Sequence, residues 1–164
     1  MWQIEERIDI PQPPERVFDY LAHFDNIREW DPSVLTARQI SPGLPSLGTR
    51  FALTLLFGLS RVPMVYEITS RTPDRALVLT GRADSFKAVD RILFDPVPGG
   101  TRLTYIAEVH FRQAPGRRLG GFGERLFRVN AGRAVRRLRA LFAGTSPSPR
   151  LSTLTRLADQ ALLP

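Results

Sequence analysis

Between residues 34 and 112, short runs of alternating apolar and polar residues are separated again and again by turn-forming residues. Alternation with a period of two is typical of strands with one buried face, and Pro98-Gly99-Gly100 is a strong hairpin signal. The pattern predicts strands at 34–41, 49–57, 61–70, 75–82, 85–95 and 101–112. Such a series of strands predicts an antiparallel sheet.

The sequence on either side of these runs predicts one more strand and three helical segments. Residues 2–10 alternate, and the prolines from Pro11 to Pro14 precede an apolar helical face that extends to about residue 24. A second short helical turn, capped by Asp25, extends to Trp30. Residues 119–143 carry apolar residues at a helical period, as expected for a long amphipathic helix. This is an α+β order of elements, and a long helix on the concave side of a curved sheet would enclose a cavity.

The composition narrows the chemistry that the chain can perform. Its 164 residues match one domain of ordinary size, which needs no disulfide or metal to fold. The absence of cysteine excludes disulfides, thiolate catalysis, iron–sulfur clusters and cysteine zinc sites. The two histidines, His23 and His110, stand far apart, so we predict neither a metal site nor a cofactor. The first six residues do not resemble a signal peptide and no run of roughly 18 apolar residues occurs, so we expect a cytoplasmic protein.

Motifs near the first helices and at two turns carry a family resemblance. They are Ile10-Pro11, Pro14-Glu15-Arg16-Val17-Phe18-Asp19-Tyr20-Leu21, Asp25-Asn26-Ile27, Glu29-Trp30-Asp31-Pro32, Gly48-Thr49 and Gly100-Thr101-Arg102-Leu103-Thr104-Tyr105. With them the chain resembles the START-like, or SRPBCC, superfamily over roughly residues 2 to 142, and looks most like its polyketide cyclase/dehydrase and lipid transport branch. The resemblance implies a helix-grip fold, in which a curved seven-stranded antiparallel sheet grips the long C-terminal helix.

The resemblance and the composition together divide the chain in two. We expect a START-like helix-grip domain at 1–143, followed by a Ser/Pro linker and a short amphipathic tail at 144–164. Members of the superfamily include hydrophobic-ligand carriers, aromatic cyclases, ubiquinone-binding proteins, hormone receptors and cochaperone domains. The fold alone therefore does not select one function.

Three polar side chains fall on the inward face of the predicted sheet. The alternation places Tyr66, Asp90 and Tyr105 in phase with apolar neighbours on their strands. A carboxyl group on an apolar face must find a hydrogen-bond or charge partner, or else become neutral. Asp90 is therefore a candidate polar anchor for a ligand, or a general acid/base aided by the two tyrosines. The alternatives are a β-bulge that turns Asp90 outward, or a structural ion pair.

The last helix offers basic partners. Arg133 and Arg137 fall beside Leu126 inside the apolar stripe, where they could bind a carboxylate, a phosphate or Asp90. The alternative is that their stems pack while the guanidinium groups stay in water. Trp30 lies in a segment that, in the resembled family, forms the wall or rim of the cavity. A buried core tryptophan would fit the same position equally well.

These considerations give one set of predicted ligand-binding residues. They are Trp30, Phe51, Leu53, Leu55, Met64, Tyr66, Asp90, Ile92, Tyr105, Leu126, Arg133 and Arg137. Asp90, Tyr105 and Tyr66 are also the candidates for a catalytic role. Two further polar groups point elsewhere, because Glu108 and His110 are out of phase with the apolar positions of their strand and should face solvent. His23 should cap the end of the first helix.

The basic residues are concentrated at the end of the chain. The net charge is +7, Lys87 is the only lysine, and the basic excess lies after residue 112. The arginines predicted to face outward on the last helix are Arg118, Arg125, Arg128, Arg136 and Arg139. No motif for reading nucleic-acid sequence accompanies them, so we expect a solvated face and, at most, weak contact with an anionic membrane surface.

The sequence supports two main functional hypotheses. The first is a carrier or sensor that binds a small hydrophobic ligand, resembling a lipid, polyketide or isoprenoid, in an internal cavity. The second is a cofactor-independent polyketide cyclase or dehydratase that uses Asp90, the tyrosines and an inward arginine. A third, an adaptor that binds a partner or an anionic surface through the arginine-rich helix, would leave a filled core. The sequence indicates no oligomeric state.

Overall fold

A computed structural model of the chain describes residues 1–112 and 117–144, with side chains in the last helix from Gly121 onward. In chain order the elements are β1 (Trp2–Ile10), α1 (Pro14–Ala22), the 3-10 turn η1 (Phe24–Asn26), α2 (Ile27–Trp30), β2 (Val34–Gln39), β3 (Arg50–Phe57), β4 (Ser60–Thr72), β5 (Ala76–Arg82), β6 (Phe86–Val97), β7 (Gly100–Phe111) and α3 (Arg117–Ala143). Apart from Gly144, the predicted linker and tail lie outside the described residues.

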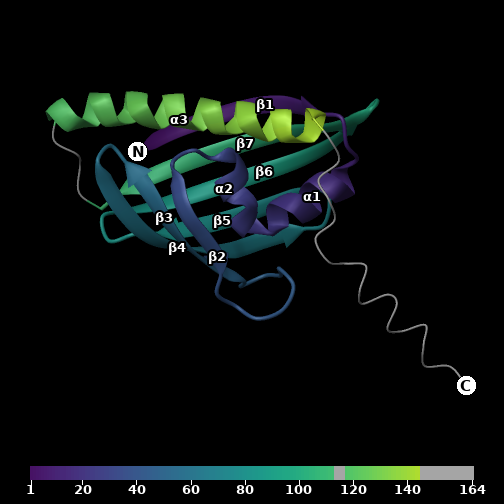
Figure 1. The fold of residues 1–164 in the computed structure, drawn as a ribbon, viewed down its shortest axis with the longest axis horizontal. Coiled ribbons are helices and arrows are strands. Elements are labelled where there is room, and N and C mark those ends of the chain that lie inside the picture. Colours follow the sequence, from purple (N-terminus) through teal and green to yellow (C-terminus); the bar gives the residue numbers. More distant parts are fainter. Residues whose placement is uncertain (113–116, 145–164) are drawn as a thin grey trace, which may run out of the picture.

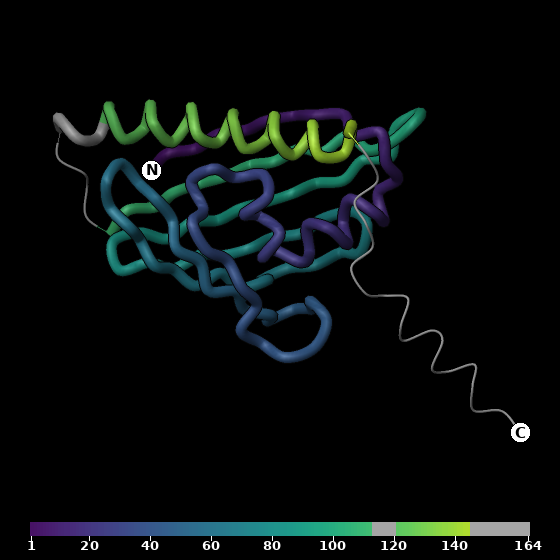
Figure 2. Tube along the Cα trace, viewed as in Figure 1, coloured from purple at the N-terminus to yellow at the C-terminus, as the bar shows by residue number. Residues whose placement is uncertain are grey.

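The strands form one open antiparallel sheet. Its order is β1-β7-β6-β5-β4-β3-β2, so each strand from β2 to β7 lies beside its neighbour in sequence, and β1 closes the far edge against β7. The helices lie over one face of this sheet, with α3 along β1 and next to α2 (Figure 1). The chain trace shows α3 extending along most of the sheet (Figure 2). The predicted helix-grip fold is confirmed.

The first helix forms where the sequence predicted it. Pro14 occupies the first position of α1, where proline loses no hydrogen bond, and Glu15 lies in the first turn. Nδ1 of His23 lies 2.9 Å from the Asp19 carbonyl oxygen, which confirms the predicted capping role. Asp25 differs from its prediction, because it lies inside η1 and no side chain caps either η1 or α2.

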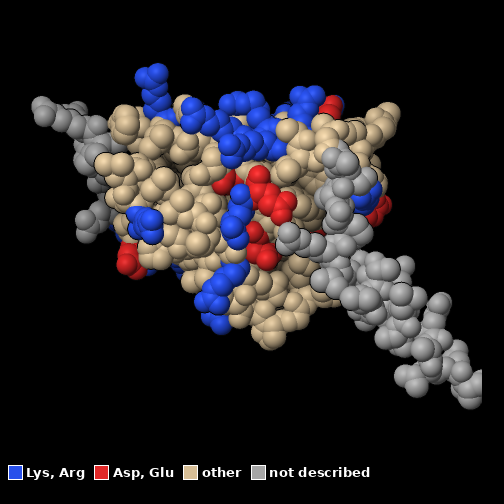
Figure 3. All heavy atoms as spheres, viewed as in Figure 1, with Lys and Arg blue, Asp and Glu red and all other residues tan. Residues whose placement is uncertain are grey.

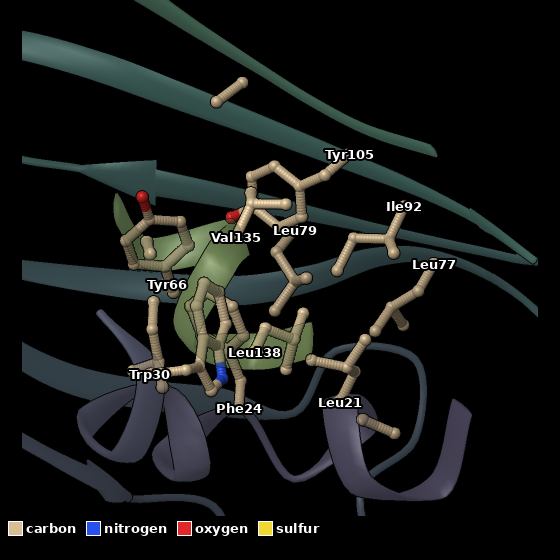
Figure 4. Close-up of a cluster of buried hydrophobic side chains, with 14 of the residues drawn as sticks. Leu21, Phe24, Trp30, Tyr66, Leu77, Leu79, Ile92, Tyr105, Val135 and Leu138 are labelled. Carbon is tan, nitrogen blue, oxygen red and sulfur yellow. The ribbon is translucent and has the colours of Figure 1, made fainter. Parts of the chain in front are cut away.

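The interior is solid at the end covered by α1. The ring centroids of Phe18 and Phe94 lie 5.2 Å apart, and Leu21 is fully buried with Leu77 and Ile92 of the sheet. Figure 4 shows Leu21, Leu77 and Ile92 on the same side of the cluster as Leu138 of α3. Each such side chain contributes roughly 1.5–3 kcal/mol by burial. This end therefore anchors the sheet and the helices to each other.

The strand register fixes the direction of the central side chains. Asp90 pairs with Leu79 of β5 and with Ala107 of β7 in a continuous register. The register shifts that the structure does contain lie elsewhere, at Val34/Thr36 and at Ile68/Ser70. No bulge turns Asp90 outward, and it faces the interior as its phase predicted.

The β6–β7 hairpin requires a glycine for its close approach to β1. A methyl group at Gly100 would overlap the backbone carbonyl oxygen of Ile10, an atom that cannot move without breaking the β1–β7 pairing. We expect Gly100→Ala to destabilise the protein by at least about 2 kcal/mol in urea unfolding. Gly121 of α3 has open space around it, so Gly121→Ala should instead stabilise by about 0.5–1 kcal/mol. Equal effects of the two substitutions would contradict the close β1–β7 contact.

Candidate functional site

The other end of the interior is hollow. A cavity of about 260 Å³ lies between the sheet, α2 and the middle of α3. Its walls are mainly apolar, with polar groups at a few positions. The lining residues are Trp2, Ile27, Trp30, Asp31, Ser33, Leu53, Leu55, Leu56, Phe57, Val62, Tyr66, Ser85, Phe86, Ala88, Asp90, Tyr105, Ala107, Val109, Phe111, Phe127, Asn130, Ala131, Ala134 and Val135.

The cavity exists because small side chains face one another across it. Ala131 and Ala134 of α3 lie over Ala88 and Ala107 of the sheet, and all four line the space. A missing side chain in a packed interior leaves a void, because the backbone relaxes only partly. One turn beyond Ala134, Leu138 fills the interior again. The alanines therefore set where the solid core ends and the cavity begins.

Asp90 is the central polar group of the cavity. It is only 5% exposed, between Tyr66 and Tyr105, which are each 6% exposed. Burial raises the pKa of Asp90 to about 7, while hydrogen bonding by the hydroxyls of Tyr66 and Tyr105 opposes that rise. Burial and the nearby Asp90 charge raise the pKa of both tyrosines well above the usual range, so both stay protonated and act as donors.

A second carboxyl group borders the cavity at the end of α2. The Asp31 carboxyl accepts hydrogen bonds from the backbone N–H and the hydroxyl of Ser33, at 2.8 and 2.7 Å. Burial nevertheless raises the pKa of Asp31, and the Ser33 hydrogen bonds and the charge of Arg137 act in the opposite direction. The charge of Asp31 in turn raises the pKa of Asp90. The two carboxyl groups therefore oppose each other's ionisation.

Aromatic rings surround the space. Trp30 is 1% exposed and lies edge-on to Tyr105, with ring centroids 5.9 Å apart, and Figure 4 shows both rings beside Tyr66 and Val135. Among the described residues, Nε1 of Trp30 is a buried polar atom with no hydrogen-bond partner. At the other side of the cavity, Trp2 stacks near Phe57 and meets Phe111 edge-on at 4.5 Å.

The structure brings together half of the predicted ligand-binding residues. Those that line the cavity are Trp30, Leu53, Leu55, Tyr66, Asp90 and Tyr105. Three others are buried but lie in the solid core. Phe51 packs on Phe24 with ring centroids 6.0 Å apart, Met64 lies over Gly81, and Ile92 lies at the end covered by α1. The alternation predicted that these three face inward, but it could not distinguish filled from hollow interior.

The three predicted residues of α3 differ from the prediction. Arg133 and Arg137 are exposed, and neither they nor the partly buried Leu126 line the cavity. The face that meets the sheet runs through Phe127, Ala134 and Leu138, each one position later than the predicted residue. Successive residues of a helix are rotated by about 100°. The three predicted residues therefore lie at the edge of the buried face and not at its centre. Arg137 acts on Asp31 from this edge, and the predicted pairing with Asp90 is not found.

The cavity contains polar residues that the sequence analysis did not predict as ligand-binding. Asp31 entered only as part of a motif that carries the family resemblance, and Ser33 was not considered. Asn130 was the one residue that the sequence could have indicated, because it is a polar residue one turn before Ala134 on the buried face of α3. Trp2 also lines the cavity, and its phase with Ile4 did predict an inward direction.

The remaining polar predictions concern the outer surfaces. Glu108 lies outside the cavity lining and forms ion pairs with Arg91 at 2.5 Å and with His110 at 3.1 Å, so this pair faces outward as expected. The predicted outward arginines from Arg125 to Arg139 are exposed on α3, where basic side chains form a row along the molecule (Figure 3). The side chain of Arg118 lies outside the described residues.

No described helix is long and apolar enough to cross a membrane. No group of three or more potential metal-ligating side chains occurs in residues 1–112 and 117–144.

Fold and cavity together define a helix-grip protein with an internal chamber. The chain belongs to the polyketide cyclase/dehydrase and lipid transport family, whose profile matches residues 1–143. This confirms the predicted family. No curated protein sequence matches the chain significantly.

Solved structures share the fold at low sequence identity. Protein TTHA0849 from Thermus thermophilus is 18% identical, with a TM-score of 0.72 over 87% of this chain and 99% of that chain. A START superfamily protein from Mycobacterium smegmatis is 14% identical, with a TM-score of 0.70 over 87% and 98% of the two chains. The Zhui aromatase/cyclase from Streptomyces sp. R1128 is 13% identical, with a TM-score of 0.66 over 86% and 91%.

The raised pKa of Asp90 predicts a pH dependence of stability. Between its unfolded value near 4 and its folded value of about 7, the folded protein holds a proton that the unfolded chain releases. The free energy of unfolding should therefore fall as the pH rises through this range, by at most about 1.4 kcal/mol per pH unit for one proton. Asp31, whose pKa is also raised, acts with the same sign.

Urea unfolding between pH 4.5 and 8 measures this slope. We expect Asp90→Asn to remove most of it, because the amide resembles the neutral carboxyl and does not titrate. Asp95→Asn, at an exposed position on the same strand, should leave the slope unchanged. A slope that survives in Asp90→Asn would show that another group is responsible.

Proposed function

We propose that this protein binds a small, largely apolar molecule in its internal cavity and acts as a carrier or sensor of that molecule. The observation that carries the proposal is the hollow of about 260 Å³ beside a core of buried side chains. Interiors are normally close-packed, so alanines facing each other across a void weaken the fold and call for a compensating role. Apolar walls with a few placed polar groups are typical of small-molecule sites. An adaptor that works only through the surface of α3 has no need of such a space.

The volume limits the size of the ligand. A cavity of about 150 Å³ is enough for benzene, so a space of about 260 Å³ suits a body of one or two fused rings, or a short branched chain. A long acyl chain would have to extend past the rim, where Phe57 is 40% exposed. The ligand is therefore of polyketide-fragment or short isoprenoid size.

Native mass spectrometry of the protein from its own host tests this function. We expect a stoichiometric small molecule that is released on denaturation. Ala107→Phe should abolish it, because the added ring occupies the cavity from the middle of β7. Ile106→Phe adds the same ring on the opposite face of the same strand and should retain it. An empty wild-type protein, or retention of the molecule by Ala107→Phe, would contradict the proposal.

A second candidate function is proton transfer in a cyclase or dehydratase. Asp90 favours it, because a pKa of about 7 lets the carboxyl accept and return a proton near neutral pH. Tyr66 and Tyr105 are donors on either side of it and could hydrogen-bond to a substrate carbonyl oxygen as an enolate forms. The inward arginine of the sequence hypothesis is not part of this arrangement. One structural neighbour is an aromatase/cyclase, which fits this candidate.

A proton-exchange assay decides between the two functions. It measures, by proton NMR in deuterated buffer near pH 7.5, how fast the α-protons of 1-tetralone exchange. This bicyclic ketone suits the size of the cavity. If the chain catalyses proton transfer, the wild type should accelerate exchange at least tenfold over buffer and Asp90→Asn should not. Exchange at the buffer rate with the wild type would rule out this candidate for ketones of that size. Equal acceleration by Asp90→Asn would remove Asp90 from the mechanism.

A further inference from the structure

The charged groups of the cavity all have one sign. Among its described lining residues, Asp31 and Asp90 are the charged side chains, and none is an arginine, lysine or histidine. This contrasts with the strongly basic chain, whose net charge is +7. Arg137, which is exposed on α3, is the basic residue whose charge acts on Asp31. The described lining of the cavity therefore contains two carboxyl groups and no basic side chain.

Asp90 in particular lacks an ionic partner. It is 5% exposed and faces the cavity, and no ion pair to it occurs within the described residues. Its hydrogen-bonding neighbours are the hydroxyls of Tyr66 and Tyr105, which are neutral. A buried carboxylate without a cation is costly, so Asp90 is poised to gain a positively charged partner from the ligand.

The surrounding rings fit the same ligand chemistry. Three buried aromatic residues line the cavity together with Asp90: Trp30, Tyr66 and Tyr105. Figure 4 shows the three rings grouped together. The faces of aromatic rings attract cations, most strongly where water is excluded. Carboxylate or phosphate ligands would instead meet two acidic groups at close range.

We propose that the ligand carries a protonated amine on an apolar body, with the ammonium group between Asp90 and Asp31 and the body against the apolar wall of the cavity. This proposal rests on the ligand-binding function proposed above and names the chemical class of the ligand. The apolar body then faces Phe127 and Trp2, and the ammonium group donates hydrogen bonds to the two carboxyl groups.

Binding of an amine is expected to be coupled to loss of a proton from Asp90. The groups that face Asp90 are Asp31 at the end of α2, Tyr66 of β4 and Tyr105 of β7, with Arg137 of α3 acting on Asp31. An ammonium ion favours the ionised form of Asp90, so binding expels the proton that Asp90 holds below a pH of about 7. The affinity for an amine should therefore rise from pH 5.5 to pH 8. The affinity for an uncharged ligand should not.

Titration calorimetry with three matched probes tests the charge class. The probes are 2-(naphthalen-1-yl)ethylamine, which stays protonated at pH 8, 2-(naphthalen-1-yl)ethanol and 1-naphthylacetate. At pH 8 we expect the amine to bind at least tenfold more tightly than the alcohol, and the carboxylate to bind most weakly. Asp90→Asn should cost the amine at least tenfold and change the alcohol by less than threefold. Asp95→Asn on the same strand should alter neither.

The outcomes separate the two proposals. Binding of the alcohol or the carboxylate as tightly as the amine, or an unchanged amine affinity in Asp90→Asn, would overturn the amine proposal and leave the cavity a ligand site. Failure of all three probes to bind the wild type, together with an empty protein from the host, would overturn ligand binding itself. If Asp90→Asn does not fold, the rise in amine affinity between pH 5.5 and pH 8, absent for the alcohol, gives the same test on the wild type.

Discussion

The contact of α3 with the concave face of the sheet is the interaction on which the rest of the structure depends. An open antiparallel sheet exposes one apolar face, and this single helix, together with α1 and α2, covers it. The side chains that α3 presents differ along its length. Leu138 and Phe142 are large and complete a solid core, whereas Ala131 and Ala134 are small and leave space. One helix thereby both closes the fold and creates the cavity.

The hollow end of the core determines the electrostatics of the site. Because Asp90 points from β6 into a space without basic side chains among its described walls, no cation of the protein pairs with its carboxylate, and its pKa rises to about 7. Tyrosine hydroxyls lessen the cost but supply no charge. Asp31 brings a second carboxyl group to the cavity and not a positive charge that would balance Asp90. The described arginines of α3, from Arg125 to Arg139, are exposed, so the cavity and the outer surface of this helix carry charges of opposite sign.

Much of the fold follows from local pattern, and the reasons are visible in particular elements. The alternation in β3 and β6 predicted both strands and the inward direction of Asp90, since a period of two leaves little freedom once one face is buried. Pro14 and the apolar face behind it predicted α1. The site was predicted less completely. Arg133 and Arg137 were assigned to the wrong face of α3, because a shift of one residue moves a helical side chain by about 100°. Asp31 was not predicted as a ligand-binding residue, because the resemblance placed the segment around Trp30 at the cavity wall without showing which of its side chains border the cavity.

The sequence alone determined the order and kind of the elements, the family, the absence of thiol chemistry and the inward phase of Tyr66, Asp90 and Tyr105. These properties depend on residue type and on spacing along one strand or helix, which the chain carries locally. Only the tertiary structure decided that Ala88 and Ala107 of the sheet face Ala131 and Ala134 across a void. It alone placed Asp31 beside Asp90 and kept the arginines outside. Voids and charge neighbourhoods arise between segments far apart in the chain, so they depend on the docking of α2 and α3 on the sheet, which no local period encodes.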